Sequence, residues 1–157
     1  DFSPSAIRKA RDYLNKDWNI SSVKLVVQDM RELQFEYEMF NVIIDASSIQ
    51  HVSYSDHKKV YGNVFKILKP NGYFWSFHIA EGSWGYGTGN LIDYKTFDDI
   101  AEGQLQGVGI ICMLSDKDVD VLLKNAGFKV TYVEKIVRTY GNQEKQIVHW
   151  IVEAIKP

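Results

Sequence analysis

The pattern of apolar and polar positions divides residues 40–77 into a strand, a helix and a second strand. Residues 41–46 form a short apolar run rich in β-branched side chains, which is typical of a strand covered on both faces. Ser53 or Ser55 can then cap a helix by accepting hydrogen bonds from its first-turn amides. Apolar residues recur after them at helical spacing: Val60, Val64, Ile67 and Leu68. Residues 73–77 are again apolar and predict the second strand.

The Lys-Pro-Asn-Gly sequence at residues 69–72 predicts a sharp turn between this helix and the second strand. Proline cannot donate to the helical hydrogen-bond ladder, and Asn-Gly tolerates a positive φ. Two strands joined by a helix lie parallel with a right-handed crossover, and such sheets bind ligands outside the carboxyl ends of their strands. Residues 47–51, which follow the first strand, are therefore the first candidates for a binding site.

The segment before this unit predicts one helix and one further strand. Ser3 is an N-cap serine and Pro4 occupies the first helical position, so we expect a helix that runs to about Asn15. Residues 23–27 form a short apolar run that predicts a strand.

The segment after this unit predicts a loop region, a helix and a terminal hairpin. Residues 80–114 contain four glycines within a few positions and read as a loop region, with one short helix near residues 96–101. Ser115 and Asp118 form a capping signal for a helix that Gly127 ends, and its buried face is expected to carry Val119, Leu122, Leu123 and Ala126. Two strand-like runs follow, joined by a Thr-Tyr-Gly-Asn turn, and predict an antiparallel hairpin: residues 128–134 and 146–155.

Length and composition are those of one globular domain. The chain has 157 residues, with 18 basic and 20 acidic side chains in no long run of either sign, which does not favour nonspecific nucleic-acid binding. Cys112 is the only cysteine, which excludes a disulfide framework and fits a cytoplasmic protein. No apolar run has membrane length, so we expect no membrane association.

Five motifs, taken in order, resemble class I S-adenosylmethionine-dependent methyltransferases. Residues 1–5 are similar to the acidic end of that family's second strand, and residues 28–30 to the end of its third. Residues 40–52 resemble the fourth strand, and residues 68–74 the entry to the fifth. The Leu-Leu-Lys-Asn-Ala-Gly-Phe sequence at residues 122–128 resembles the step before the final hairpin.

The resemblance implies an α/β fold with a doubly wound, mostly parallel sheet that ends in an antiparallel hairpin. We expect a single methyltransferase-like domain over residues 1–157, with residues 80–114 as a lid or substrate-side insertion. The family's first strand and glycine-rich loop would precede Asp1, so we expect upstream residues to supply them. The alternatives are that a partner chain supplies the pairing or that the sheet is rearranged. Because an unpaired strand edge recruits other strands, we also expect the chain to form homo-oligomers.

The same resemblance assigns S-adenosylmethionine as cofactor and names five residues that would bind it. Asp1 would accept hydrogen bonds from the ribose hydroxyls, or it is an acid at a helix start. Asp29 would accept the adenine amino group, or it caps a helix, and Met30 would pack on the base. Phe2 would pack on the adenine or enter the core, and Ser47 would place backbone groups near the sulfonium or begin a helix.

Histidines are the weak candidates for catalysis. His51 and His78 follow or close neighbouring strands, so both would project into one crevice, where a neutral imidazole can accept a proton; isolated histidines are more often structural. We place His57 on an exposed helical surface and His149 inside the last strand. The spacing of the four suggests no metal site.

Alternatives remain open for both function and insertion. A nicotinamide-dependent enzyme would use Gly85, Gly87 and Gly89 as a phosphate loop, although no long helix follows them. A non-catalytic module would act by pairing with another chain. The function that the resemblance implies is methyl transfer from S-adenosylmethionine to a small-molecule acceptor. This reaction depends on alignment of the reacting atoms more than on acid or base residues. Four aromatic residues of the insertion would form a mobile lid or lie in the core: Trp84, Tyr86, Tyr94 and Phe97.

Overall fold

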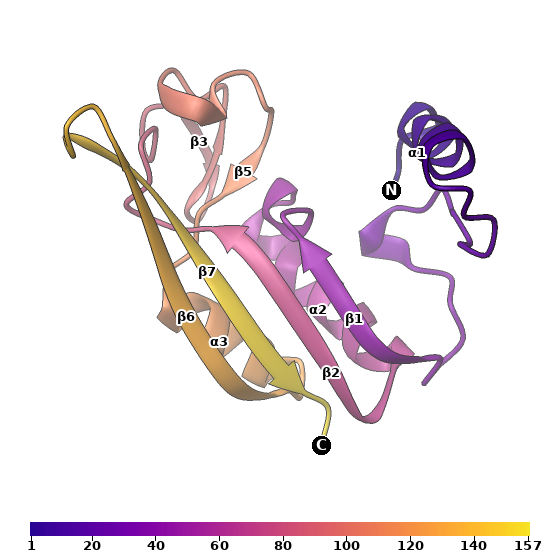
Figure 1. Cartoon of the computed structure of the whole chain (residues 1–157). Coiled ribbons are helices and arrows are strands. Elements are labelled where there is room, and N and C mark those ends of the chain that lie inside the picture. The colour runs from indigo at the N-terminus through magenta and orange to yellow at the C-terminus, as the bar shows by residue number, and fades with distance from the viewer. The chain divides into compact units, whose positions relative to one another are not determined.

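The computed structural model describes all 157 residues as two compact units, Asp1–Phe35 and Glu36–Pro157 (Figure 1). The expectation of one domain over the whole chain stays a prediction.

The first unit is built around helix α1, Pro4–Asp17. The expected N-cap is confirmed, because the Ser3 hydroxyl oxygen accepts a hydrogen bond from the amide of Ala6 at 3.3 Å. The expectation of a strand at residues 23–27 is wrong. The segment forms no ladder, because its backbone bonds only to Asp1, through Val26 O and Gln28 N. A one-turn 3-10 helix, η1 (Met30–Glu32), follows.

The second unit contains a four-stranded sheet in the order β1-β2-β7-β6. Strands β1 (Phe40–Ala46) and β2 (Leu68–Ile79) are parallel and are joined by helix α2 (Tyr54–Ile67), as predicted, with Ser53 as the N-cap. Strand β7 (Lys145–Ile155) pairs antiparallel with β2 on one side and with β6 (Lys129–Tyr140) on the other. The α/β fold with a terminal antiparallel hairpin is therefore confirmed.

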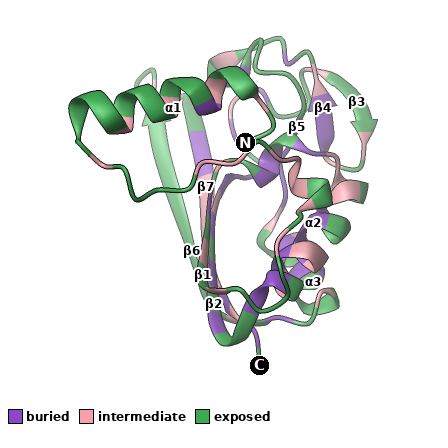
Figure 2. Cartoon of the chain, turned by 90° about the vertical axis from the view of Figure 1, so that its right-hand side faces the viewer, coloured by how far each residue is buried: buried purple, intermediate pink, exposed green.

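Helices α2 and α3 (Asp116–Asn125) lie on the same face of this sheet (Figures 1 and 2). Aromatic rings join the two layers, because Phe74 of β2 contacts Tyr61 of α2 with ring centroids 6.0 Å apart and Phe128 at 5.6 Å. The capping box predicted for α3 is present between Ser115 and Asp118. None of the helices combines the length and the apolar run that crossing a membrane requires.

Strand β1 is not covered on both faces, contrary to expectation. Val42 is 51% exposed and Ile44 is 73% exposed, and Figure 2 shows the exposed positions of the sheet. The physical reason is that α2 and α3 cover only one face of the sheet, whereas Val42 and Ile44 point to the other face. Strand β1 also lies at the edge of the sheet and pairs only with β2.

The turn predicted at residues 69–72 is wrong, because these residues lie inside β2, at an irregularity in its pairing with β1. The positive φ expected at Asn-Gly is nevertheless present. Asn71 has φ of 60°, and a Cβ atom at Gly72 would lie 2.8 Å from the Lys69 carbonyl oxygen and 2.9 Å from that of Asn41. Only glycine fits between these two backbone segments, which fixes where β2 passes β1.

Residues 80–114 form a small antiparallel sheet, so the short helix expected near residues 96–101 is wrong. Its strands are β3 (Asn90–Asp93), β4 (Thr96–Asp98) and β5 (Ile111–Cys112), with a 3-10 turn η3 (Gly103–Leu105) between β4 and β5. Lys95 has φ of 47° and closes the turn between β3 and β4, which places the side chain of Phe97 in the core. We call residues 80–114 the insertion sheet.

Candidate functional site

Ser47 stands directly after β1, where parallel sheets bind ligands. Its φ is 62°, a left-handed conformation that is uncommon for a residue other than glycine. The Ser47 amide donates a hydrogen bond to the carbonyl oxygen of Phe77 at 2.7 Å, which ties the end of β1 to β2. Strained residues of this kind are held only by well-determined surroundings and are common at ligand sites.

Asp45 holds this turn in place, and the sequence interpretation missed it. Its buried carboxylate accepts hydrogen bonds from the amides of Ser48 at 2.9 Å and Ile49 at 3.1 Å through Oδ1. The hydroxyl of Ser76 donates to Oδ2 at 2.8 Å. An aspartate followed closely by serine is a typical turn signal, and it was the sign of this role in the sequence.

Gln50 is a second buried polar residue at this edge. Its Oε1 accepts a hydrogen bond from the amide of Ile79, the last residue of β2, at 2.8 Å. Asp45 and Gln50 together complete the backbone hydrogen bonding where β1 and β2 end, so they shape this edge rather than act as free acids or bases.

In the first unit, Asp1 and Asp29 terminate two neighbouring backbone segments. The α-amino group of Asp1 donates to Val26 O at 3.4 Å and the amide of Gln28 donates to Asp1 O at 3.0 Å, which is the hydrogen-bond pattern of parallel pairing. The Asp1 carboxylate accepts one hydrogen bond, from the Ser3 amide at 2.8 Å through Oδ1.

Asp29 is both a cap and an ion-pair partner. It accepts a hydrogen bond from the amide of Arg31 at 2.8 Å, so the capping role left open in the sequence interpretation is present. The Arg31 guanidinium also binds this carboxylate through Nε and through Nη2, the latter at 2.6 Å. Phe2 is 73% exposed and therefore does not enter the core, whereas Met30 is half-buried.

The two candidate catalytic histidines occupy different environments. His51 is exposed, and its Nδ1 lies 3.1 Å from the carbonyl oxygen of Ile110 in the insertion sheet. His78 is buried, its Nδ1 lies 3.2 Å from Ile79 O, and its Nε2 has no hydrogen-bond partner. Burial lowers the pKa of His78 to about 4, so the imidazole is neutral at pH 7. No described contact brings these two side chains together.

The placement of His57 on an exposed surface is wrong. Its side chain is 2% exposed, and its Nδ1 lies 2.8 Å from the carbonyl oxygen of Ser53. Burial lowers the pKa of His57 to about 4 as well. His149 lies inside β7, as predicted. The described residues contain no group of three His, Cys, Asp or Glu side chains arranged to hold a metal ion.

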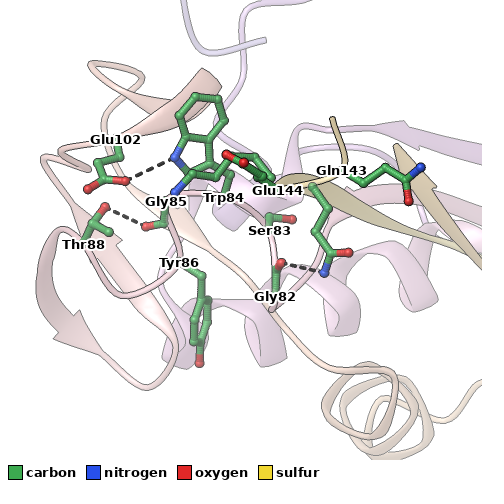
Figure 3. A pocket seen from close by; sticks show the side chains of 11 residues that line it. Gly82, Ser83, Trp84, Gly85, Tyr86, Thr88, Glu102, Gln143 and Glu144 are labelled. Carbon is green, nitrogen blue, oxygen red and sulfur yellow. Dashed lines mark hydrogen bonds between the residues drawn. The ribbon is translucent and has the colours of Figure 1, made fainter. Parts of the chain in front are cut away.

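A pocket of about 400 Å³ lies after the carboxyl end of β2 (Figure 3). It is lined by the loop at residues 82–88, by Glu102, and by residues 143–146 at the tip of the β6–β7 hairpin. None of the seven predicted cofactor and catalytic residues lines it.

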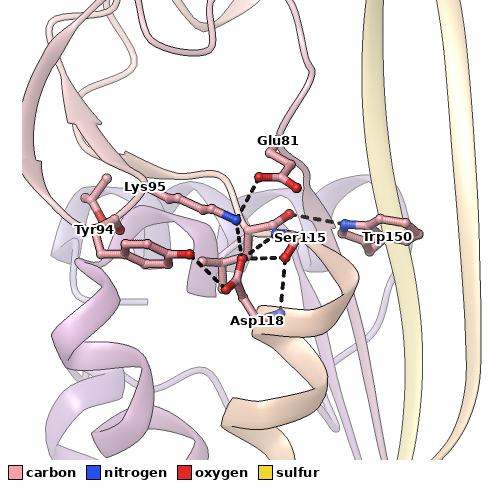
Figure 4. A network of polar contacts seen from close by, with 8 residues as sticks. Glu81, Tyr94, Lys95, Ser115, Asp118 and Trp150 are labelled. Atoms are coloured by element: carbon pink, nitrogen blue, oxygen red, sulfur yellow. Dashed lines mark hydrogen bonds and ion pairs between the residues drawn. The ribbon is translucent and has the colours of Figure 1, made fainter.

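A polar network fixes the insertion sheet to α3 (Figure 4). The Lys95 ammonium lies 2.7 Å from Glu81 Oε2 and 2.5 Å from Asp118 Oδ2. Burial acts to lower the pKa of Lys95, but its bonds to the two carboxylates raise that pKa above its ordinary value. The Tyr94 hydroxyl donates to the same Asp118 at 3.2 Å, so the turn between β3 and β4 is anchored at two residues.

Sequence comparison finds two relationships. Residues 1–72 match a family model described as a methyltransferase domain. Over 126 residues the chain is 29% identical to a sterol 24-C-methyltransferase of Candida albicans, an alignment that covers 80% of this chain and 32% of that protein. The chain thus spans about a third of the length of this curated relative.

Solved structures share the fold. A S-adenosylmethionine-dependent methyltransferase of Methanosarcina mazei superposes with a TM-score of 0.78 at 18% identity, over 99% of this chain and 79% of that one. The 1,6-didemethyltoxoflavin-N1-methyltransferase of Burkholderia thailandensis, with bound S-adenosylhomocysteine, superposes with a TM-score of 0.64 at 14% identity, over 91% of this chain and 54% of that one.

Proposed function

The chain has the fold of class I S-adenosylmethionine-dependent methyltransferases, and from this premise we propose that it takes part in methyl transfer to a small-molecule acceptor. The observation that carries the proposal is the order of the methyltransferase-like elements, which runs from Asp1 to the final hairpin. Bound S-adenosylmethionine would supply an electrophilic methyl group, which leaves its sulfur for a nucleophilic atom of the acceptor. The residues of the chain would bind the cofactor and the acceptor, orient the reacting atoms toward each other and exclude water.

The carboxylates of the first unit have the chemistry that an adenosine group needs. Asp1 Oδ1 accepts from Ser3, which leaves Oδ2 for ribose hydroxyls. Asp29 would accept the adenine amino group beside Arg31, and Met30 and the exposed ring of Phe2 would supply apolar contact for the base. The assignment of Ser47, in the second unit, to the cofactor rests on the resemblance and on the left-handed turn that it forms after β1.

Binding of S-adenosylhomocysteine tests this proposal. We expect calorimetry on the protein with its complete sequence to detect binding, and Asp1→Ala to weaken it about tenfold or more, because two charge-assisted hydrogen bonds are lost. Asp12→Ala, which removes an exposed acid of α1, is the matched control and should leave the affinity unchanged. Absence of binding by the complete protein, or equal losses in the two variants, would contradict the cofactor assignment.

A second candidate function follows from the exposed edge of β1. Strand β1 has no partner strand on one side, and its apolar residues Val42 and Ile44 are exposed. Such an edge favours a module that pairs with a further strand from a second copy or from another chain. Under this alternative the protein would self-associate and bind no cofactor. A cytoplasmic location also belongs to the proposal, supported by the single buried thiol of Cys112.

A further inference from the structure

The pocket after β2 brings together two segments that are distant in the sequence. The glycine-rich loop at residues 82–88 forms one wall, and the tip of the β6–β7 hairpin forms another (Figure 3). A hydrogen bond from Gln146 Nε2 to Gly82 O at 3.1 Å and one from the Trp84 amide to Gln146 O at 2.7 Å hold the walls together. The pocket is therefore a built feature of the second unit.

Trp84 provides a fixed aromatic surface in this pocket. Its indole N–H donates a hydrogen bond to Glu102 Oε2 at 3.2 Å, and its carbonyl and ring lie against Gly103, where a Cβ atom would be 3.0 Å from the ring. Gly85 packs equally closely on the backbone of Glu102, where a Cβ atom would lie 2.6 Å from the carbonyl oxygen. The two glycines thus allow the segments of Trp84 and Glu102 to approach closely, and the hydrogen bond fixes the Glu102 carboxylate at the indole N–H.

An ammonium group already lies on this surface. Lys145 Nζ is 5.5 Å from the centroid of the Trp84 ring, within the range of a cation–π contact. Two carboxylates line the same pocket, those of Glu102 and Glu144, so its formal charge is −1 even with Lys145 present. An indole surface beside carboxylates is the usual recognition chemistry for an organic ammonium group.

We propose that this pocket binds a small ligand through an organic ammonium group, which replaces the Lys145 ammonium on the Trp84 ring. Lys145 is exposed, so its ammonium can move into solvent when the ligand binds, and the two carboxylates balance the charge of the ligand. The proposal is independent of methyl transfer, because no lining residue belongs to the cofactor candidates. It assigns a binding role to the glycine-rich loop that the nicotinamide alternative would have used for phosphate.

Titration with choline, followed by proton–nitrogen NMR of the full-length protein, tests the proposal. We expect choline to shift the indole N–H signal of Trp84, identified by its loss in Trp84→Phe, with saturation in the millimolar range. The neutral carbon isostere of choline, in which a tert-butyl group replaces the trimethylammonium group, should cause no such shift at matched ionic strength. Equal shifts from the two compounds would overturn the proposal, because the contact would then be merely apolar.

Two variants locate the site. Lys145→Gln should tighten choline binding about three- to tenfold, since the competing ammonium is removed, and Glu102→Gln should weaken it. Lys135→Gln is the matched control, because Lys135 lies over the ring of Trp150, outside the pocket, at 5.7 Å. No Trp84 shift in either the wild type or Lys145→Gln, or the same change of affinity in Lys135→Gln, would overturn the proposal.

Discussion

Ser47 differs from the other residues of the proposed site in having a left-handed backbone conformation. Its φ of 62° is one that glycine adopts without strain, yet serine is held there by the bond from its amide to Phe77 O. The side chain is therefore retained at an energetic cost, as at many ligand sites.

Substitutions at Ser47 should show this cost in the free energy of unfolding. Ser47→Gly should raise it by up to about 1 kcal/mol, because relief of the left-handed strain exceeds the extra chain entropy of glycine. Ser47→Val should lower it by about 1 to 2 kcal/mol, because a β-branched residue fits this conformation poorly. Urea unfolding measures both, and Ser48→Val, at φ of −93°, is the control. The interpretation is wrong if Ser48→Val costs as much as Ser47→Val.

Two buried histidines should make the fold sensitive to acid. Burial lowers the pKa of His78 and of His57 to about 4, whereas the same side chains in the unfolded chain have the ordinary histidine pKa of 6.5. Between pH 4 and pH 6.5 the unfolded state binds more protons than the folded state. The contribution of the neutral histidines to the free energy of unfolding is therefore complete above about pH 6.5 and is lost as the pH falls toward 4. The loss should reach roughly 3 kcal/mol for each histidine.

The measurement is the urea midpoint at a series of pH values from 7 down to 4.5. His78→Gln should flatten the pH dependence, because it removes one of the two titrating groups. His51→Gln is the control, since that side chain is exposed and the steep dependence should persist. A slope that is unreduced in both His78→Gln and His57→Gln would assign the acid sensitivity to other groups.

At the scale of elements, periodic patterns predicted the sheet and its helices but not the insertion. Strand β1, helix α2, helix α3 and the final hairpin follow from apolar spacing and caps, because each is long enough to show a period. The insertion sheet is made of strands of four, three and two residues, too short for any period to be visible. The turn between β3 and β4 has a positive φ at Lys95, and the sequence has no glycine at that position to indicate it.

The error at His57 has a different cause. His57 precedes Val60 by three residues and Tyr61 by four, so it belongs to the buried stripe of α2. Its polarity suggested exposure, but the Ser53 carbonyl oxygen satisfies the ring nitrogen inside the helix's first turn. Burial of a polar side chain depends on such local partners, which a hydrophobic pattern does not contain.

Lys95 should be the main anchor of the insertion sheet on α3. Its side chain is 16% exposed and contacts two carboxylates, so Lys95→Met would leave Glu81 and Asp118 facing each other without a cation. We expect a loss of about 2 to 4 kcal/mol in the free energy of unfolding. Lys124→Met breaks an exposed pair with Asp120 and should cost about 0.5 kcal/mol or less.

Thermal and urea unfolding of the two variants provide the comparison. Hydrogen exchange adds a local readout, because loss of the anchor should speed exchange of insertion-sheet amides more than those of β2 and β7. Similar stability of Lys95→Met and Lys124→Met would show that the network does not anchor the insertion.

At the scale of the whole molecule, the burial of β1 was the feature that its own sequence did not determine. The apolar sequence of a strand indicates that its faces can be buried. Whether they are buried depends on segments elsewhere in the chain or on other chains. The same holds for the site: residue types and strand ends indicated Asp1, Asp29 and Ser47, but the buried supports Asp45 and Gln50 emerged only from the folded turn.

The exposed edge predicts self-association of the chain. Ile44→Lys should reduce the average mass measured by light scattering, because a charge on an edge strand disfavours pairing with another strand. Val121→Lys, which changes an exposed apolar residue of α3, is the control and should leave the mass unchanged. A wild-type chain that is monomeric at all concentrations contradicts the prediction.

Strand β7 has a consequence for how the protein is made. It is the last strand in the sequence, yet it lies between β2 and β6 and bonds to both along most of its length. While the nascent chain leaves the ribosome, β2 and β6 therefore wait without their shared partner until residue 155 has emerged. Their edges are open to chaperones during that interval, and the four-stranded sheet can be completed only after β7 has been made.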